Sequence, residues 1–477
     1  MLLALIIAPL SFAVITFFIP HQRLRAIMLP IGGSAHLILV TITLISPQIA
    51  KPSPWLAIDP LNRLVLGLLS FLFFICSLYT PGYLRLRANR PNRVFCSALF
   101  AFLATMSLAV LAQHLGLMWV AIEACTLSLA PLIYFNHNPR SIEATWKYLL
   151  IGSVGIALAL LGSFFLSYAA LATGKPVSLF FNELVSDGVH LSRPWLRAAF
   201  ILLFVGYGTK MGLAPMHSWK PDAYGEAPGL VGALLAGGLT SCAFLAVLRF
   251  FRICLAAGET AFAQQIMIIS GLASMAIAGI FMIGQRDFKR LLAYSSVEHM
   301  GILVLGVGIG GLATFGSLLH LINNGLTKAV LFLAAGNIHR AYQSKLVNEV
   351  SGAMRRLPIS GALLLAGFFA ITGSPPFGPF ISELTILRAA IANNQILITV
   401  LFLLFLLVVF MGMGTQILAV VQGEPSRAAT NTNIKDHFLT VAPIIICCAL
   451  VLLLGIYLPT PLVNALQVAA NFLEKTL

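Results

Sequence analysis

The chain has 477 residues, of which 59% are hydrophobic and only 9% are charged, and its mean hydropathy is +0.96. A soluble domain of this length needs far more charge to cover its surface, so the soluble classes of protein are excluded. The net charge of +14 comes from 29 Lys and Arg against 15 Asp and Glu. Because the basic residues lie mostly in short loops between apolar segments, this charge indicates membrane topology, and we expect no nucleic-acid partner.

Apolar segments of membrane-spanning length recur along the whole chain. The first lacks the basic start and the cleavage site of a secretory signal, so we interpret it as the first membrane helix. At about 20 residues for each crossing, the pattern predicts an all-α polytopic membrane protein with about 14 transmembrane helices. The predicted spans are 2–20, 26–47, 62–82, 94–113, 115–135, 144–172, 198–219, 228–253, 264–284, 291–308, 311–338, 358–393, 396–421 and 438–458.

Two of these spans, the seventh and the twelfth, contain helix-breaking residues. The seventh carries Gly206, Gly208, Gly212 and Pro215, and the twelfth carries Gly373, Pro375, Pro376, Gly378 and Pro379. Broken helices at membrane depth are tolerated only beside packed protein or a polar cavity. Both segments are therefore candidate functional positions.

The cysteines give no sign of a metal or redox centre. All seven lie in or beside apolar stretches and none forms a C-x-x-C pair; they are Cys76, Cys96, Cys125, Cys242, Cys254, Cys447 and Cys448. We expect buried thiols, no metal site and no cofactor on this chain. Any redox chemistry must then belong to a partner, and whether the chain forms part of an enzyme stays open.

Loop charges predict an orientation. With the N-terminus outside, the basic loops come to lie inside; they carry Arg85, Arg87, Arg90, Arg93, Arg286, Lys289, Arg290, Arg340, Lys345, Arg355 and Arg356. An even number of helices returns the C-terminus to the outer side. We therefore expect a multi-pass protein of the cell inner membrane with both termini on the periplasmic side.

Ionisable side chains at mid-membrane depth need a reason, because each one is costly to bury. Glu123 has apolar neighbours for a full turn on both sides and is either functional or a neutral carboxyl bonded to a neighbouring helix. Lys210 lies at the break of the seventh span, where a carboxylate can hold its proton and desolvation can remove it. We propose Glu123 as that partner. Glu143, Lys147, Arg249 and Arg252 lie near helix ends, where snorkelling or a local i,i+4 pair is an adequate explanation.

A second group of polar residues lies in the later helices. His320, Asn324 and Lys328 recur at i, i+4 and i+8 and form a ridge on one helical face, which either lines a water chain or joins helices by hydrogen bonds. Glu383 follows the break of the twelfth span. His299 has a side chain suited to proton transfer, or it is structural.

The spacing of these residues suggests an internal repeat. Glu123 precedes Lys210 by 87 residues and Glu298 precedes Glu383 by 85. Each pair joins a carboxylate to an ionisable residue on a broken helix, and a separation of five helices makes the two units inverted. We expect helices 1–3 in 1–93, a first repeat in 94–253, an inverted repeat in 264–421, and the last helix with its tail in 438–477.

Four motifs resemble those of antiporter-like subunits of respiratory complex I, Mrp-type Na⁺/H⁺ antiporters and membrane-bound hydrogenases. They are GYGTKMGLAPMHSWKPDAYGEAPGLVGALLAG, QRDFKRLLAYSSVEHMG, HLINNGLTKAVLFLAAG and GSPPFGPFISELTIL. The resemblance covers nearly the whole chain. The stretches WVAIEACTLSLAPLIYF and PRSIEATWKYLLIGSVGIALALLG are most similar to the F-type subunit of group 4 nickel–iron hydrogenases, of the hydrogenase-4 or second formate hydrogenlyase type.

This resemblance implies roles for particular residues. Glu123 matches the family's essential carboxylate on helix five, and Lys210 matches its partner lysine on broken helix seven. Lys328 falls on the lysine of an H-x-x-x-H-x-x-x-K pattern, and Glu383 falls at the distal Lys/Glu position on broken helix twelve. The implied proton relay is a hydrated axis parallel to the membrane, made of Glu123, Lys210, His299, His320, Lys328 and Glu383.

The sequence also departs from the family pattern. Ser241 stands where many relatives have a lysine on helix eight, so the middle of the relay passes through water, His299 or Lys328, or is absent. Asn324 stands where many relatives have histidine. We also expect no counterpart of the long lateral helix of one complex I subunit, because 438–458 is the last predicted helix and only a short tail from Asn471 follows it.

Three functions remain in competition. The first is proton translocation driven by a peripheral, hydrogenase-like redox module and other membrane subunits in the lipid bilayer. The second is cation/proton antiport or the proton-fed part of a bicarbonate-uptake system. The third is a membrane spacer without pumping, which Ser241 favours.

Overall fold

Apolar helices long enough to cross a membrane dominate the computed structural model, which describes residues 1–46, 52–87, 90–174, 177–425 and 434–474. Within these ranges eleven spans meet the length and composition of a membrane helix. They are α2 (Gln22–Ile45), α3 (Pro60–Arg85), α4 (Arg93–Leu111), α5 (Leu115–Ile133) with the 3-10 turn Tyr134–Asn136, α6 (Pro139–Leu171), α10–α11 (Gly229–Ala256), α12 (Thr260–Met282), α13 (Phe288–Ile309), α14 (Leu312–Tyr342), α18 (Ile396–Val421) and α19 (Phe438–Ile456).

Three further segments complete the predicted set of fourteen. They are α1 (Ala4–Phe18), α8 (Arg193–Met211) and the broken pair α16 (Pro358–Ile371) and α17 (Gly378–Ala392). Shorter helices connect them: α7 (Phe181–Ser186), α9 (Trp219–Glu226) and α15 (Ala353–Arg356). The prediction of a polytopic all-α protein is confirmed, although the predicted boundaries at residues 47 and 477 lie outside the described residues.

Polar caps fix where several helices begin. Asp59 and Asn62 form a reciprocal capping box at the start of α3, and Asn138 and Ser141 form another at the start of α6. A proline occupies the first turn of both helices, where its missing N–H has no intrahelical partner to lose. Both helices consequently begin earlier than the apolar pattern predicts, at 60 in place of 62 and at 139 in place of 144.

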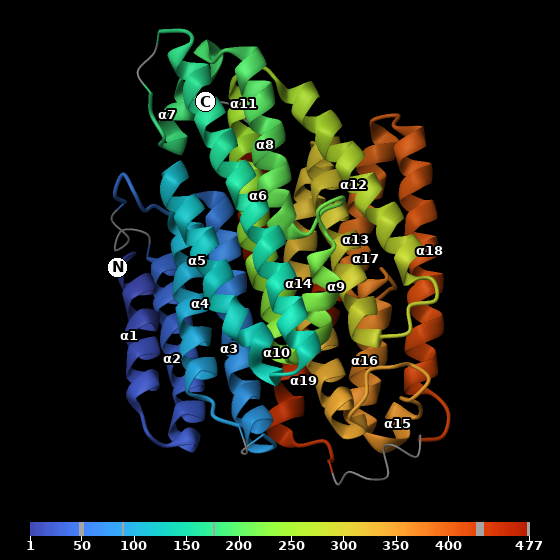
Figure 1. Ribbon diagram of the computed structural model, residues 1–477. Coiled ribbons are helices and arrows are strands. Elements are labelled where there is room, and N and C mark those ends of the chain that lie inside the picture. The colour runs from blue at the N-terminus through green and yellow to red at the C-terminus, as the bar shows by residue number, and fades with distance from the viewer. Residues whose placement is uncertain (47–51, 88–89, 175–176, 426–433, 475–477) are drawn as a thin grey trace.

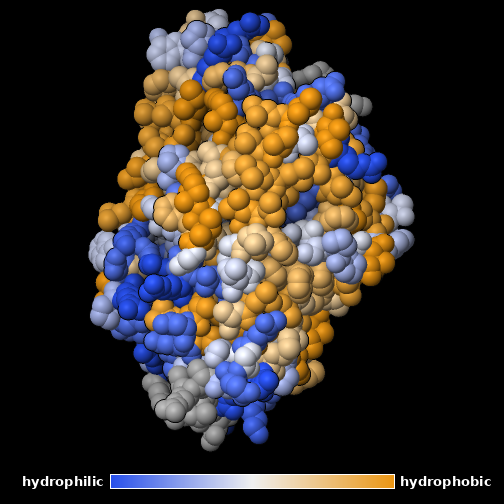
Figure 2. All heavy atoms as spheres, turned by 90° about the vertical axis from the view of Figure 1, so that its right-hand side faces the viewer, coloured by the Kyte–Doolittle hydropathy of each residue, from blue (hydrophilic) through white to orange (hydrophobic). Residues whose placement is uncertain are grey.

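The centre of the bundle is made of helices that have almost no exposed surface. Helices α10–α11, α13 and α14 are buried over nearly their whole length, whereas α18 and α2 expose much of theirs. In Figure 1 the N-terminal helices α1–α5 stand on one side, α16–α18 on the other, and α13 and α14 between them. Figure 2 shows a broad apolar surface over the upper and central part of the side that carries α18, with hydrophilic residues at the top, at the left from mid-height downward and at the bottom.

Both predicted breaks are present in the structure. Helix α8 ends at Met211, and Gly212 follows with a φ of +75°. Helix α16 ends at Ile371, and Gly373 follows with a φ of +66° before α17 begins. Positive φ is easily adopted only by glycine, so these residues allow the chain to turn inside the bundle. The predicted span 198–219 consequently covers most of α8 and an irregular segment, and the short helix α9 begins at its last residue.

One helix was not predicted. The sequence suggests only a short tail after 438–458, but α20 (Thr460–Glu474) follows α19 and packs across α3 and α14. The guanidinium of Arg252 lies 3.6 Å from the ring centroid of Phe472, and Glu474 accepts hydrogen bonds from Gly311 N–H at 2.6 Å and from Thr314. Helix α20 therefore connects the end of α11 with the turn between α13 and α14. It was not predicted because it is shorter than a membrane span and has a polar face.

The charged residues near helix ends behave in two ways. Lys147 pairs with Glu143 at 2.6 Å, as the i,i+4 spacing predicts. Arg249, in contrast, does not snorkel: its buried guanidinium lies 3.2 Å from Asp59 and also bonds to the carbonyls of Ala112 and Val110. The interpretation of Arg249 from local spacing was therefore wrong, because its partners belong to α3 and α4.

Candidate functional site

The structure brings Glu123 of α5 and Lys210 of α8 together. Lys210 Nζ lies 3.5 Å from Glu123 Oε2 and donates a hydrogen bond to Thr126 Oγ1. Ser153 of α6 donates to the other carboxylate oxygen of Glu123 at 3.2 Å. Lys210 is 1% exposed and Glu123 is 23% exposed. We call this contact the α5–α8 ion pair; a charge that deep is held only by a nearby opposite charge and further hydrogen bonds.

Small and aromatic residues shape the space around the Lys210 ammonium. Gly152 of α6 lies so close that a Cβ there would stand 2.7 Å from Nζ. The ring of Tyr148 lies below the ammonium, with its centroid 5.8 Å away. Trp219 donates its indole N–H to the carbonyl of Thr209 at 2.9 Å, which satisfies a carbonyl of the last turn of α8. The broken helix thus holds Lys210 at a defined position.

A second group of polar side chains lies between α13, α14 and α17. His299 Nδ1 and His320 Nε2 are 2.9 Å apart, and His320 Nδ1 is 2.9 Å from Ser382 Oγ. Each ring nitrogen can donate or accept depending on its tautomer, so a proton shared along this line can move without moving the rings. We call His299, His320, Ser382 and Glu383 the histidine cluster.

Two carboxyl groups border the histidine cluster. Glu383 is 5% exposed, and its Oε1 has no hydrogen-bond partner among the described residues. Glu298 is also buried, and its Oε2 lies 3.7 Å from His299 Nε2. Buried polar atoms are rarely left unsatisfied, so these oxygens are positions for water molecules or for a transferred proton.

The same cluster has the donor types of a metal site. One ligand atom from each of His299, His320 and Glu383 lies within 4.8 Å of the others, and imidazole with carboxylate suits zinc. Both ring nitrogens of His320 are engaged, however, with His299 and Ser382. A metal would have to displace at least one of these bonds, so the geometry favours proton exchange.

Lys328 occupies the other end of the predicted polar ridge of α14. Its Nζ donates to Ser295 Oγ at 2.7 Å and lies 3.4 Å from the Leu292 carbonyl, both on α13. His320, two turns earlier on α14, contacts α17 in addition to α13. Asn324 lies between them, and its Oδ1 has no partner in the part of the chain that the structure describes. The ridge therefore joins helices and also keeps unsatisfied polar atoms inside the bundle.

Sequence reasoning missed two residues of this region. Ser382 was overlooked beside Glu383, although it bonds directly to His320. Lys220 of α9 was quoted within a motif but not singled out, and it is fully buried. Lys220 lies beside Pro221 between the predicted spans 198–219 and 228–253, where the sequence pattern does not distinguish it from an exposed loop lysine. Only its burial in the structure marks it as a candidate site residue.

These residues form a row across the bundle. Glu123 belongs to α5, Lys210 to α8, Lys220 to α9, Lys328 to α14 and Glu383 to α17; in Figure 1 the labels α14 and α9 stand between α5 and α8 on one side and α17 on the other. The members of the row are all groups that can gain or lose a proton.

Fold and site together define an antiporter-like membrane subunit, which is a class of polytopic proteins with buried ionisable residues on broken helices. Residues 112–411 match the family described as the NADH:quinone oxidoreductase/Mrp antiporter transmembrane family. The chain belongs to this family. The family resemblance predicted from the sequence motifs is confirmed.

Relatives of the chain are subunits of several membrane complexes. It is 36% identical over 429 residues to a hydrogenase-4 component F homolog of Methylacidiphilum infernorum, which covers 87% of this chain and 88% of that protein. It is 32% identical over 339 residues to an NADH-quinone oxidoreductase subunit N of Desulforudis audaxviator, covering 70% and 66%.

The fold is that of solved antiporter-like subunits. A chain of the membrane-bound sulfane sulfur reductase, an archaeal respiratory membrane complex, superimposes with a TM-score of 0.88, 19% identity and coverage of 100% of this chain and 98% of that one. A chain of the Mrp complex from Dietzia sp. DQ12-45-1b gives a TM-score of 0.85, 19% identity, and coverage of 99% and 97%.

Proposed function

We propose that this chain moves protons through the row of buried ionisable residues, driven by a redox module on partner subunits. The observation that carries the proposal is the row itself: an ion pair at one side, a histidine cluster at the other and buried lysines between them. Buried charges and unsatisfied carboxyl oxygens are costly in a membrane interior, and a protein that needed only to fold would have apolar residues there. The proposed relay comprises Glu123, Lys210, His299, His320, Lys328 and Glu383.

The α5–α8 ion pair is the proposed input. A movement of α5 or α8 imposed by a neighbouring subunit would change the 3.5 Å contact between Glu123 and Lys210. Without its carboxylate, a desolvated ammonium gives up its proton more readily. Breaking a buried pair costs about 3–5 kcal/mol, comparable to the about 2.3 kcal/mol for moving one charge across each 100 mV of membrane potential. The pair is therefore strong enough to couple to pumping.

We further propose that the partners resemble those of a hydrogenase-4 complex. Support comes from the relative named as a hydrogenase-4 component F homolog, which is similar over most of both chains. The redox reaction would take place on other subunits, and this chain would supply the proton path in the cell inner membrane.

The proposed internal symmetry and orientation rest on two observations. Residues 94–253 and 264–421 each contain one broken helix with a positive-φ glycine at the break, Gly212 in the first and Gly373 in the second, as inverted repeats would. Arginine and lysine gather at the end of the bundle that carries α15, among them Arg87, Lys345 and Arg355. By the positive-inside rule this end faces the cytoplasm, and both termini face the periplasm.

The proposal is tested on the assembled complex in liposomes. Lumenal pH is followed while the redox module is driven by its own electron donor. We expect the Lys210→Ala variant to assemble and to turn over with an uncoupler present, but to lose redox-driven acidification. Lys147→Ala, which removes a half-exposed lysine of α6, is the matched control and should acidify normally. Equal acidification by wild type and Lys210→Ala would assign the chain to the spacer class.

A further inference from the structure

Lys220 is the one fully buried lysine of α9, and its ammonium contacts both halves of the row. Nζ donates to the carbonyl of Met211 at 2.5 Å and to the carbonyl of Ser296 at 3.1 Å. Met211 is the last residue of α8 and directly follows Lys210. Ser296 lies on α13, next to the Ser295 that holds Lys328. The Lys220 side chain therefore contacts the backbone of the residue that follows Lys210 and the backbone of the residue that follows the hydrogen-bond partner of Lys328.

The break in α8 is shaped around this lysine. Gly212 has a φ of +75°, and a Cβ there would lie 2.5 Å from Lys220 Cδ and 3.0 Å from Nζ. The aromatic ring of Tyr224 lies on another side of the ammonium, with its centroid 5.8 Å away. The last carbonyls of a helix lack intrahelical donors and carry partial negative charge, so the Met211 carbonyl is a suitable acceptor for an ammonium at this depth.

The acceptors of Lys220 are neutral. No carboxylate forms an ion pair with Lys220 in the described ranges, in contrast with the Glu123 partner of Lys210. The charged neighbours that act on it electrostatically are Lys328 and, when protonated, His299. Like charges in a low-dielectric interior disfavour each other. Protonation of Lys220 and of Lys328 is consequently anticorrelated.

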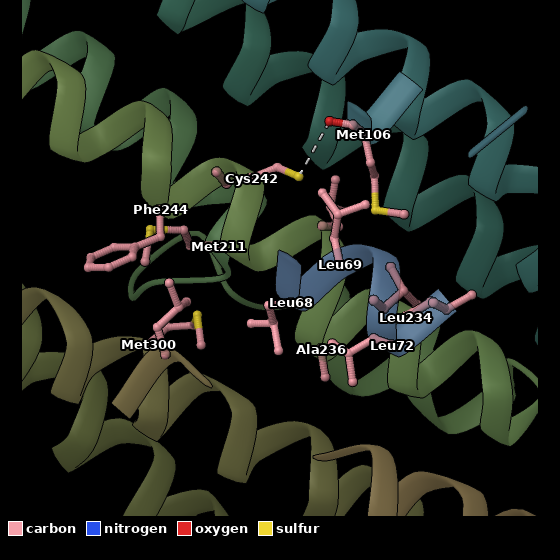
Figure 3. Close-up of a cluster of buried hydrophobic side chains, with 14 of the residues drawn as sticks. Leu68, Leu69, Leu72, Met106, Met211, Leu234, Ala236, Cys242, Phe244 and Met300 are labelled. Carbon is pink, nitrogen blue, oxygen red and sulfur yellow. Dashed lines mark hydrogen bonds between the residues drawn. The ribbon is translucent and has the colours of Figure 1, made fainter. Parts of the chain in front are cut away.

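The other region through which a proton could pass between the α5–α8 ion pair and the histidine cluster is the surroundings of Ser241, and it is apolar. Ser241 of α11 donates to the Gly237 carbonyl of its own chain turn at 2.6 Å. Next to it in the chain, Cys242 belongs to a packed cluster shown in Figure 3, which includes Leu68, Leu72, Met106, Ala236 and Met300 from four different segments. The cluster buries the Sγ of Cys242 against the Met106 carbonyl at 4.0 Å. Such packing leaves little room for water, and the cluster residues named here carry no side chain that titrates near neutral pH.

We propose that Lys220 is the relay group that connects the α5–α8 ion pair to Lys328 and the histidine cluster. This inference rests on the proposed function and assigns the central step. Neutral Lys220 accepts one proton from the Lys210 ammonium, which becomes an amine. Charged Lys220 then gives one proton to the neutral Lys328 amine, and no charge is created or lost. The anticorrelation between Lys220 and Lys328 makes the two transfers sequential.

The test compares two buried lysines that both donate to backbone carbonyls. Lys289 also donates its ammonium to two backbone carbonyls, those of Gly225 at 3.0 Å and Ala227 at 2.6 Å, but it lies at the first turn of α13, away from the row. Lys220→Gln and Lys220→Arg are compared with Lys289→Gln and Lys289→Arg in the reconstituted complex. The measured quantity is the number of protons moved per electron. This ratio does not depend on how much assembled complex each variant yields.

The arginine variants distinguish a role of the lysine in proton transfer from a purely structural role. Arginine keeps a cation and donors for both carbonyls but does not release its proton. We expect both Lys220 variants to lose at least tenfold in protons per electron, and both Lys289 variants to keep the wild-type ratio. A wild-type ratio in Lys220→Gln, or a ratio restored by Lys220→Arg, would overturn the relay. If Lys210→Ala pumps normally, the proposed function fails; if only the Lys220 variants pump normally, this inference alone fails.

Discussion

The α5–α8 ion pair and the histidine cluster solve the burial of ionisable groups in opposite ways. In the ion pair, the charge of Lys210 is balanced by Glu123, and the carboxylate also accepts a hydrogen bond from Ser153. In the cluster, two imidazoles contact each other and a hydroxyl, while Glu383 Oε1 lacks a partner among the described residues. One region stores a pair of charges, and the other is a chain of groups that can stay neutral.

This difference suggests different duties. A balanced pair responds to a change in the distance between two helices, because its energy depends on that distance. A chain of hydrogen-bonded imidazole and hydroxyl groups offers successive donors and acceptors along which a proton can move. The comparison therefore assigns sensing of the partner to the α5 side of the molecule and proton exchange to the α17 side.

The largest expected effect is a difference in the free energy of unfolding between variants of the ion pair and of the histidine cluster. Glu123→Gln leaves the Lys210 ammonium without its charge partner, so the free energy of unfolding should fall by an amount between the about 1 kcal/mol of an exposed pair and the about 4 kcal/mol of a buried one. Glu383→Gln replaces an acid that makes no ion pair with the described residues, and it should leave stability nearly unchanged. Thermal unfolding of the purified complex measures both. A greater loss in Glu383→Gln would reverse the comparison.

The next largest effect is expected at Gly373, in the break between α16 and α17 that precedes Glu383. Gly373 has a positive φ, and a Cβ there would collide with the Glu383 carboxylate. Gly373→Ala should therefore lower stability by about 1–3 kcal/mol and reduce proton movement per electron. Gly284→Ala is the control, since its φ is +74° but nothing lies within 4 Å of the added methyl. Equal pumping by both variants would mean that the position of Glu383 does not matter.

The corresponding change in the first region should affect transport more than stability. In Gly152→Ala the methyl group would lie 2.7 Å from Lys210 Nζ, and the flexible end of the lysine can move away at little cost. We expect a several-fold fall in protons per electron with a nearly unchanged melting temperature. Gly67→Ala in α3, whose methyl meets Leu44 at an ordinary 3.7 Å, should change neither quantity. An unaffected Gly152→Ala variant would show that the ion-pair geometry is not critical.

The smallest expected effect is at Ser382. Ser382→Ala removes the hydroxyl that contacts His320 Nδ1 and should cost about 1 kcal/mol, the usual contribution of one hydrogen bond. Proton movement should slow by only a few fold, because His299 remains 2.9 Å from His320. Ser163→Ala, which removes a buried hydroxyl of α6 bonded within its own helix, is the matched control. Complete loss of pumping in Ser382→Ala would give the hydroxyl an essential role.

Much of this fold could be predicted because the membrane constrains it strongly. Apolar runs and helix breakers predicted the polytopic all-α fold and both broken helices, and the motifs predicted the pairing of Glu123 with Lys210. What failed involves partners far apart in the chain. Arg249 pairs with Asp59, 190 residues away, and no local pattern reveals that contact.

The missed residues share a physical reason. Helix α20 is 15 residues long and carries a polar face, so it resembles a tail and not a membrane span. Lys220 lies beside a proline between the predicted spans 198–219 and 228–253, in a position where lysines are ordinarily exposed. Its burial follows only when α9 folds into the bundle against α6 and α13. Residues that acquire their environment from tertiary packing cannot be found by periodicity alone.

The central claim is that one connected path runs from Glu123 to Glu383. Its most direct test measures protons moved per electron in liposomes for Glu123→Gln, Glu383→Gln and the double variant. A single path in series predicts that each single variant loses nearly all redox-driven proton movement and that the double variant is no worse. If each single variant keeps about half of the wild-type ratio and only the double variant loses it, two independent paths exist and the account is wrong.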